Sequence, residues 1–291
     1  MIRENTRNSR GHSYDSHRPV RLDAAKGSSV EFAGIHLRVR GGTVKRDEGL
    51  SVVTTSWDDG HPLDIRIADL LTSYGLTGTF YVPKQVSWPV MSSVQIRDLS
   101  SRFEIGAHML EHRMLDQLTD GQAREQLSGS RGWVEQVTGK PCRTICFPGG
   151  RYRHEQLSLV REAGYLSART TELLSTEFPR RVEGLALLST TVQAYPHSPL
   201  AYIKNALKRR SFGNLVRAGA LFYRRTWLQL AGKLLERTLR RGGVFHLWGH
   251  SWEIEQERQW DRLEELLAVM AANKDKLTIT TNSELGSYAL S

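Results

Sequence analysis

Apolar and polar residues along this chain form short runs that predict strands followed by helices. The segment SVVTTSW, residues 51–57, is rich in β-branched residues, which favour a pleated strand. It is followed by Asp58, Asp59, Gly60 and Pro62, and then by LDIRIADLLTSYG, whose apolar residues have helical spacing and whose last residue is a glycine. Strand, acidic turn and helix together predict the first β/α unit of a parallel α/β fold.

The same alternation continues to the C-terminus. Further strands are expected at residues 77–82, 103–108, 143–147, 165–170, 242–250 and 276–281, and further helices at residues 94–101, 120–139, 154–163, much of 199–241, and 259–272. The stretch LALLSTTVQ, residues 185–193, is less regular. Strands that alternate with helices predict a parallel barrel or open sheet, in which chemistry lies at the carboxyl ends of the strands.

The N-terminal 50 residues differ from the rest. Residues 1–25 are rich in Arg, Ser, Asn and His without apolar periodicity, so we expect a disordered polar tail. Residues 26–50 contain VEFAGIHLRV, which alternates apolar and polar positions and predicts a short strand or hairpin that covers one end of the barrel. Residues 51–286 are expected to form one large domain.

Composition narrows the class of protein. The chain has 291 residues, 39% of them hydrophobic, which is enough for one large core or two modest ones, and we favour one domain behind a tail. The net charge is +9, but the basic residues are scattered and no recognition motif accompanies them, so we expect solvated helix faces and no nucleic-acid partner. No apolar signal segment and no run of roughly 18 apolar residues occurs, which predicts no membrane span.

The two cysteines, Cys142 and Cys146, stand four residues apart. This spacing matches neither a zinc ribbon nor a redox CxxC motif, so we expect two reduced residues beside a strand. Reduced cysteines are typical of a cytoplasmic protein, which is the location that we predict.

Candidate metal ligands stand at three predicted strand ends: Asp59, the pair His108 and His112, and His250. Successive side chains of a strand point to opposite sides, so one carboxylate of the Asp58–Asp59 pair can hold a metal while the other stays free as a base. The spacing of HMLEH places two imidazoles on one side of a helical turn, close enough to share an ion. Histidines at this spacing are also common on solvated surfaces.

These motifs in combination resemble those of the NodB-homology polysaccharide deacetylases, carbohydrate esterase family four. SWDDG resembles the family's T-[FY]-D-D-G, and HMLEH resembles H-[ST]-x-x-H, within a similarity that covers roughly residues 51–286. The resemblance implies a distorted (β/α) barrel of the NodB-homology deacetylase type. It also implies one divalent metal held by Asp59, His108 and His112, with Asp58 as the catalytic base; we expect Zn²⁺, with Co²⁺, Ni²⁺ and Mn²⁺ as alternatives.

A late motif of the family supplies the catalytic acid. GHSWE follows an apolar predicted strand and resembles that motif, which implies that His250 is the acid. His246 lies in the same strand and competes for this role. We favour His250 because it stands at the strand end, where a side chain can reach the site.

Two family motifs are altered in this chain. R-x-P-[FYW]-G falls on Cys146-Phe147-Pro148-Gly149-Gly150, so a cysteine stands where the family has the arginine that orients the base. Arg151 or Arg153, just beyond, are the candidates to replace that arginine. The D-x-x-D-W-type motif, which positions the acid histidine, is not recognisable between about residues 172 and 197.

The same residues predict a chemistry. Two imidazoles and one carboxylate leave open positions on a divalent metal, which can lower the pKa of bound water and polarise a carbonyl. Asp58 then accepts the water's proton, a backbone N–H near Phe147 helps to stabilise the oxyanion, and His250 protonates the leaving amine. The predicted reaction is hydrolysis of an N-acetyl group on an amino sugar or N-acetylated glycoconjugate, which releases acetate.

Aromatic residues near the strand ends are candidates to bind the carbohydrate. Indole faces suit the apolar face of a sugar, although core packing is an equally ordinary role for tryptophan. His197, in YPHSP, is either a loop histidine or a site residue. The expected substrate contacts are Phe147, Pro148, Trp88, Trp248 and Trp252, and Trp57 also lies near a strand end.

Three other functions stay open. Two histidines and one carboxylate also form the facial triad of non-haem iron oxygenases, although the α/β alternation and the adjacent aspartates speak against an oxygenase. The altered third motif allows a carbohydrate-binding protein that keeps the fold without catalysis. A deacylase of a small biosynthetic intermediate would use the same chemistry on a different substrate.

Overall fold

The structure is a computed structural model that describes residues 30–32, 35–37, 49–208 and 226–291. The tail predicted for residues 1–25 lies outside these residues. Within the predicted segment 26–50, β1 (Val30–Phe32) and β2 (Ile35–Leu37) form an antiparallel pair, as the alternating pattern predicts. That this pair covers one end of the barrel stays a prediction.

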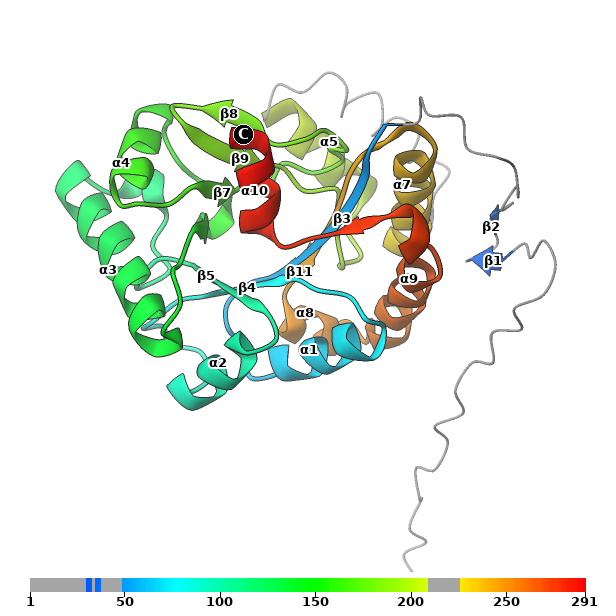
Figure 1. Ribbon diagram of the computed structural model, residues 1–291, viewed down its shortest axis with the longest axis horizontal. Coiled ribbons are helices and arrows are strands. Elements are labelled where there is room, and N and C mark those ends of the chain that lie inside the picture. Colours follow the sequence, from blue (N-terminus) through cyan, green and yellow to red (C-terminus); the bar gives the residue numbers. More distant parts are fainter. Residues whose placement is uncertain (1–29, 33–34, 38–48, 209–225) are drawn as a thin grey trace, which may run out of the picture.

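The main domain consists of a curled sheet with helices on its outer side (Figure 1). Its strands are β3 (Ser51–Trp57), β4 (Thr79–Val82), β5 (Glu104–Ala107), β6 (Thr144–Cys146), β7 (Ser167–Arg169), β8 (Arg180–Val182), β9 (Leu185–Leu188), β10 (Val192–Gln193), β11 (Gly243–Gly249) and β12 (Thr278–Ile279). Its α-helices are α1 (Asp64–Ser73), α2 (Ser93–Ser100), α3 (Asp120–Thr138), α4 (Leu157–Glu162), α5 (Pro199–Lys208), α7 (Trp227–Arg241), α8 (Ser251–Gln256), α9 (Trp260–Ala272) and α10 (Asn282–Leu290). Short 3₁₀ turns lie at Leu115–Gln117, Pro148–Gly150, His154–Gln156 and Lys274–Lys276.

The strand order is β10-β11-β3-β4-β5-β6-β7-β9-β8, and β12 pairs with β3. All neighbours are parallel except β8 and β9. In the described part of the chain β10 and β8 are the two edges, so the sheet curls without closing. The predicted distorted (β/α) barrel is confirmed, and the sheet is mixed because of the antiparallel β8.

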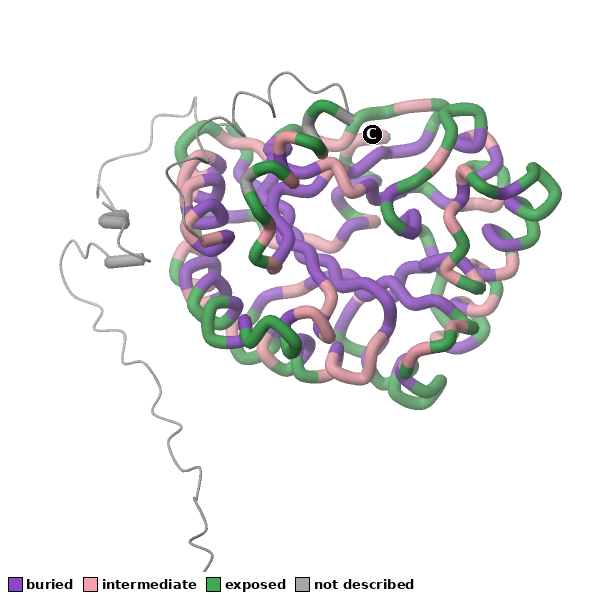
Figure 2. The backbone as a smooth tube through the Cα atoms, turned by 180° about the vertical axis from the view of Figure 1, so that it is seen from behind, coloured by how far each residue is buried: buried purple, intermediate pink, exposed green. Residues whose placement is uncertain are grey.

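β3 lies at the centre of this sheet. It pairs with β11 along its whole length, with β12 near its start and with β4 near its end. All seven of its residues are buried, and Figure 2 shows this strand within a continuous buried layer. A strand covered on both faces needs apolar or small β-branched residues at every position, which explains the run SVVTTSW. Its carboxyl end therefore delivers Asp58 and Asp59 to the middle of the barrel.

The predicted helices are present where the structure describes the chain, and residues 209–225 of the predicted helical region 199–241 lie outside the described residues. The ends of α3 have identifiable causes. Thr119 caps α3 with a hydrogen bond from the Gln122 amide, and Gly139 ends the helix with a φ of 69°. Serine, threonine and glycine suit these positions because they satisfy unpaired backbone groups or adopt left-handed geometry. The sequence pattern did not predict β8, β9, β10, α8 or α10. Two of these elements, β10 and α8, border the site described below.

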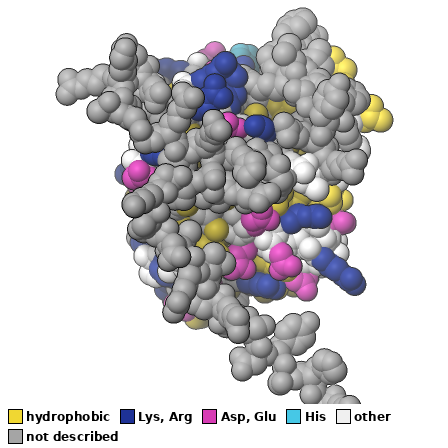
Figure 3. Space-filling view, turned by 90° about the vertical axis from the view of Figure 1, so that its right-hand side faces the viewer, with side chains coloured by type: hydrophobic (Ala, Val, Ile, Leu, Met, Phe, Trp, Pro, Cys, Tyr) yellow, Lys and Arg dark blue, Asp and Glu magenta, His cyan; other side chains and the backbone are white. Residues whose placement is uncertain are grey.

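Charged side chains of both signs cover the outer helices. On the described part of the face in Figure 3, basic and acidic groups lie beside one another. On α7, Glu236 accepts from Lys233 at 2.9 Å and lies 3.9 Å from Arg240. This arrangement agrees with solvated helix faces. None of the helices in the described ranges is long and apolar enough to cross a membrane.

Candidate active site

Two adjacent carboxylates begin the site at the end of β3. Asp58 is 2% exposed and Asp59 is 7% exposed. Asp59 has a φ of 76°, which turns the backbone sharply before Gly60, whose φ is 61°. A left-handed aspartate is uncommon, and here it separates the surroundings of the two side chains. The expectation that the neighbours occupy different environments therefore agrees with the geometry.

Asp59 faces the two histidines of HMLEH. Its Oδ1 atom lies 3.5 Å from Nε2 of His108 and 3.3 Å from Nε2 of His112. The expected helical turn is wrong, because residues 108–112 form a loop in which Met109 and His112 have φ angles of 64° and 54°. The loop nevertheless brings the imidazole rings to 4.6 Å between centroids, so the predicted grouping of the three side chains is present.

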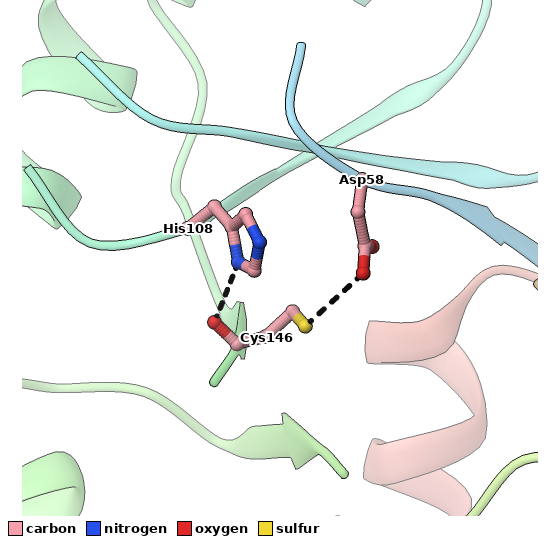
Figure 4. Close-up of side chains that lie close together, drawn as sticks. All are labelled: Asp58, His108 and Cys146. Carbon is pink, nitrogen blue, oxygen red and sulfur yellow. Dashed lines mark hydrogen bonds between the residues drawn. The ribbon is translucent and has the colours of Figure 1, made fainter. Parts of the chain in front are cut away.

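Hydrogen bonds to other residues engage Nδ1 of His108 and Oδ2 of Asp59, and they leave Nε2 and Oδ1 facing each other. Nδ1 of His108 lies 2.9 Å from the Cys146 carbonyl oxygen (Figure 4). A carbonyl oxygen only accepts, so Nδ1 carries a proton, and Nε2 is the ring nitrogen that faces Asp59. Trp252 donates from Nε1 to Oδ2 of Asp59 at 3.0 Å, while the buried Oδ1 has no hydrogen-bond partner among the described residues.

These three ligand atoms fit a divalent metal. They lie within 4.8 Å of one another and converge without hydrogen bonds between them. Two imidazole nitrogens and one carboxylate oxygen are the donor set of many catalytic zinc sites. The Cys146 carbonyl accepts from Nδ1 of His108 and so fixes the orientation of that ring, as outer hydrogen bonds do for metal ligands.

A second group of possible ligands consists of Asp58, His108 and Cys146 (Figure 4). The Cys146 thiol lies 3.6 Å from Oδ2 of Asp58. This group fits a cation less well, because an arginine already neutralises the Asp58 carboxylate. Burial also raises the pKa of the Cys146 thiol and opposes formation of the thiolate that would bind a metal.

That arginine is Arg169, at the end of β7, which the sequence analysis missed. One nitrogen, Nη2, contacts both carboxylate oxygens of Asp58, and Arg169 is 0% exposed. Burial alone would raise the pKa of Asp58, but the charges of Arg169, His108 and His250 hold it below the ordinary value. Asp58 is therefore ionised.

The proposed replacements for the missing arginine are wrong. Arg151 donates from Nε to Asp116 at 2.9 Å, and Arg153 donates from Nη1 to the Asp116 carbonyl at 2.7 Å. Both side chains are therefore engaged by the loop after β5, away from Asp58. In the β6–β7 pair Cys146 is the register partner of Arg169, so the charge enters from the next strand at the same level of the sheet.

His250 follows β11 and faces both carboxylates. Its Nε2 lies 4.0 Å from Oδ2 of Asp58 and 3.8 Å from Oδ2 of Asp59. Its Nδ1 donates to Glu253 at 2.6 Å, one turn further along α8. Burial would lower the pKa of His250, but Glu253, Asp58 and Asp59 raise it above the ordinary value. This histidine is suited to carry a proton.

His246, the competitor, lies deeper in the same strand. Its Nε2 accepts from the Ser56 hydroxyl at 2.9 Å, and its Nδ1 donates to the Ser189 carbonyl at 3.0 Å. Burial and the charge of Arg169 lower its pKa to about 3, so the ring stays neutral. Both ring nitrogens are engaged in hydrogen bonds, so His246 is a buried structural residue.

His197 connects to the site through two residues. Its Nε2 donates to Oε1 of Gln193 at 2.7 Å, and Nε2 of Gln193 donates to Oε2 of Glu253 at 2.7 Å. Glu253 thus receives hydrogen bonds from both Gln193 and His250. Neither Gln193 nor Glu253 was singled out from the sequence, although Glu253 is the last residue of the GHSWE motif.

The predicted substrate contacts divide into two groups. Trp88 and Trp252 are partly exposed beside the ligands: the Trp88 ring lies 5.1 Å from that of His112, and Trp252 lies 5.5 Å from His250. The other candidates are buried. Trp248 packs under the Arg169 guanidinium at 4.6 Å, and Phe147, Pro148 and Trp57 belong to the interior.

The expected donor to the oxyanion, a backbone N–H near Phe147, is also partly corrected. The Phe147 amide donates to the Arg169 carbonyl at 3.3 Å, which continues the β6–β7 ladder. Pro148 has no N–H to offer. The amide of Phe147 itself is therefore occupied.

Residues 45–168 match the family model of polysaccharide deacetylases. This match begins just before β3 and includes both the Asp58–Asp59 turn and the HMLEH loop. The resemblance seen in the motifs is thereby confirmed over residues 45–168. A comparison with curated proteins finds no match.

Solved structures share the fold. A proposed polysaccharide deacetylase from Mycobacterium smegmatis is 16% identical over 84% of this chain and 92% of that one, with a TM-score of 0.58. A family 4 acetyl xylan esterase from Clostridium thermocellum, in complex with a cobalt ion, is also 16% identical, over 81% and 91% of the two chains, with a TM-score of 0.50. At these identities the likeness concerns the fold alone.

Proposed function

We propose that this protein is a metal-dependent hydrolase that removes an N-acetyl group from an amino sugar or N-acetylated glycoconjugate and releases acetate. The observation that carries the proposal is the division of labour between two adjacent carboxylates. Asp59 faces two imidazole nitrogens, whereas Asp58 faces a buried arginine and a protonatable histidine. The family match to polysaccharide deacetylases supports the same reaction class.

The metal would be Zn²⁺ in this proposal, held by Asp59, His108 and His112. When bound, such an ion lowers the pKa of water and polarises a carbonyl oxygen. Trp252 contributes by holding Oδ2 of Asp59, which leaves Oδ1 directed at the two imidazoles.

Asp58 is the proton acceptor of the proposal. Its carboxylate is ionised beside Arg169, and it is the neighbour in sequence of the proposed ligand Asp59. As water attacks the acetyl carbon, Asp58 takes the proton that the water must lose. Positioned proton transfer of this kind contributes about 10²- to 10⁴-fold to a rate.

His250 is the proton donor. Its Nδ1–H is bound to Glu253, so Nε2 is the atom that faces the site and carries the transferable proton. An amine is a poor leaving group until it is protonated. His250 therefore gives its proton to the amide nitrogen as the C–N bond breaks, and the products are acetate and a free amine.

An acetate-release assay tests this function. Purified protein loaded with zinc is incubated with N-acetylglucosamine oligomers and with nucleotide-linked N-acetyl sugars, and Asp58→Asn serves as the inactive control. We expect acetate from at least one substrate class and at least about 10²-fold less from the variant. Carbohydrate binding without acetate release would instead indicate a non-catalytic protein, and oxygen uptake with an iron-loaded sample would indicate an oxygenase.

A further inference from the structure

Arg169 and Cys146 occupy equivalent places on neighbouring strands. They are register partners in the parallel β6–β7 pair, so their side chains leave the same face of the sheet side by side. Both reach Asp58: the Arg169 guanidinium contacts its two oxygens, and the Cys146 thiol lies 3.6 Å from Oδ2. The long side chain therefore passes next to the short one on its way to the carboxylate.

The space around this guanidinium is full. Arg169 and Cys146 are both 0% exposed, and the rings of Trp248 and Tyr81 lie 4.6 and 5.5 Å from the guanidinium carbon. Nε of Arg169 has no hydrogen-bond partner among the described residues, so Asp58 is the group that compensates its charge. A side chain longer than cysteine at position 146 would enter the volume that the guanidinium uses.

We propose that Arg169 is the positioning residue of the catalytic base and that positions 146 and 169 form a size-coupled pair, in which a small residue at one position is required for the arginine at the other. This inference rests on the proposed function, because it assigns the base role to Asp58. Arg169 fixes the rotamer of Asp58 by holding both oxygens through one nitrogen. Cys146 contributes by its small volume.

Three variants test the positioning role. Arg169→Met removes the charge but keeps an unbranched apolar stem, and we expect kcat to fall about 10²-fold with KM within about threefold, because a misplaced base slows the proton transfer and leaves substrate binding intact. Arg169→Lys keeps the charge on a shorter side chain, and its kcat should lie between those of the wild type and Arg169→Met. Arg153→Met is the matched control, since Arg153 binds backbone carbonyls away from Asp58, and its kcat should stay within about threefold.

The exchange variant Cys146→Arg plus Arg169→Cys tests the coupling. Each single substitution should abolish most activity, the first by crowding two guanidinium groups and the second by leaving Asp58 unheld. The double variant should regain at least about tenfold in kcat over Arg169→Cys, at equal metal content, because it restores one arginine and one small residue. A folded, metal-loaded double variant no better than Arg169→Cys would overturn the size-coupled pair.

A stability cycle keeps this test independent of the reaction. Chemical unfolding of Asp58→Asn, Arg169→Met and the double variant should show strong non-additivity, because either single change strands a buried charge and the double change strands none. Additive losses would contradict the pairing. A wild-type kcat in Arg169→Met would contradict it too, and if that variant does not fold, a wild-type kcat in Arg169→Lys would do so. If the wild-type protein releases no acetate, the proposed function fails while the cycle still decides whether Arg169 and Asp58 act together.

Discussion

Asp58 and Asp59 are neighbours in the chain, yet they belong to two different sides of one site. We call Asp59, His108 and His112 the metal side, and Asp58, Arg169 and His250 the proton side. On the metal side the ligand atoms converge without hydrogen bonds between them, whereas on the proton side an arginine already compensates the carboxylate. The difference teaches that the partner supplied by a neighbouring strand end, more than residue type, decides what a carboxylate can do.

The largest expected effect comes from breaking the metal side. His112→Ala removes a partly exposed ligand, so the fold should persist while zinc content and acetate release are lost together. His154→Ala, at an exposed histidine outside the site, is the control and should keep both. Full zinc occupancy in His112→Ala, measured by metal analysis, would remove His112 from the metal side.

Breaking the proton side should separate activity from metal content. Asp58→Asn keeps the shape but removes the proton acceptor, so kcat should fall by about 10²-fold or more. Zinc content should stay at the wild-type level. Asp59→Asn should instead lower the zinc content, because it removes the anionic ligand and weakens metal binding. Loss of metal in Asp58→Asn, with none in Asp59→Asn, would exchange the two sides.

The two histidines of β11 sharpen the comparison. His250→Gln should lower kcat for an N-acetyl amine by about 10²-fold or more and lower it much less for an activated aryl acetate, whose leaving group needs no proton. His246→Gln should leave the ratio of the two rates unchanged and instead lower the free energy of unfolding by about 1–3 kcal/mol, because it disturbs the two hydrogen bonds of a buried ring. Equal losses on both substrates in His250→Gln would exclude its role as the acid.

The smallest effect is expected at Glu253. Glu253→Gln weakens the hold on Nδ1 of His250 without removing the acid, so kcat for the amide should fall by about tenfold. Glu257→Gln, at an exposed position just after α8, is the matched control. A wild-type rate in Glu253→Gln would mean that the packing of α8 alone positions His250.

The metal side could be predicted from sequence because each of its residues follows a strand with a clear pattern. SVVTTSW is continuous and β-branched, and the apolar strand before His108 ends at the histidine itself, so both strand ends were located within a few residues. The helical turn expected for HMLEH was wrong because the left-handed Met109 and His112 carry no local signal. The spacing still brought the rings together, since a tight loop and a helical turn span similar distances.

The proton side was harder to foresee. The contact between Arg169 and Asp58 depends on the register between β6 and β7, which no single stretch of sequence reveals. Arg151 and Arg153 were nearer in sequence to the altered motif, but the loop after β5 captures both side chains. Proximity in sequence was a poor guide because the sheet places residue 169 beside residue 146.

Other missed elements did carry readable signals. LALL, residues 185–188, is a short apolar run of the kind that forms a fully buried strand, and β9 is buried at every position. Thr281 and Glu284 form a capping box that marks the start of α10. Glu253 stands three residues after His250, and at this spacing a side chain in the first turn of a helix can contact the residue just before the helix.

Anomalous diffraction from crystals grown with zinc tests the central claim most directly. We predict one strong zinc-edge peak, at about 2.0–2.2 Å from a carboxylate oxygen of Asp59 and from the Nε2 atoms of His108 and His112, with Asp58 outside bonding distance and still paired with Arg169. A peak bonded to the Cys146 thiolate and Asp58, or no peak at either group of ligands, would contradict the division between a metal side and a proton side.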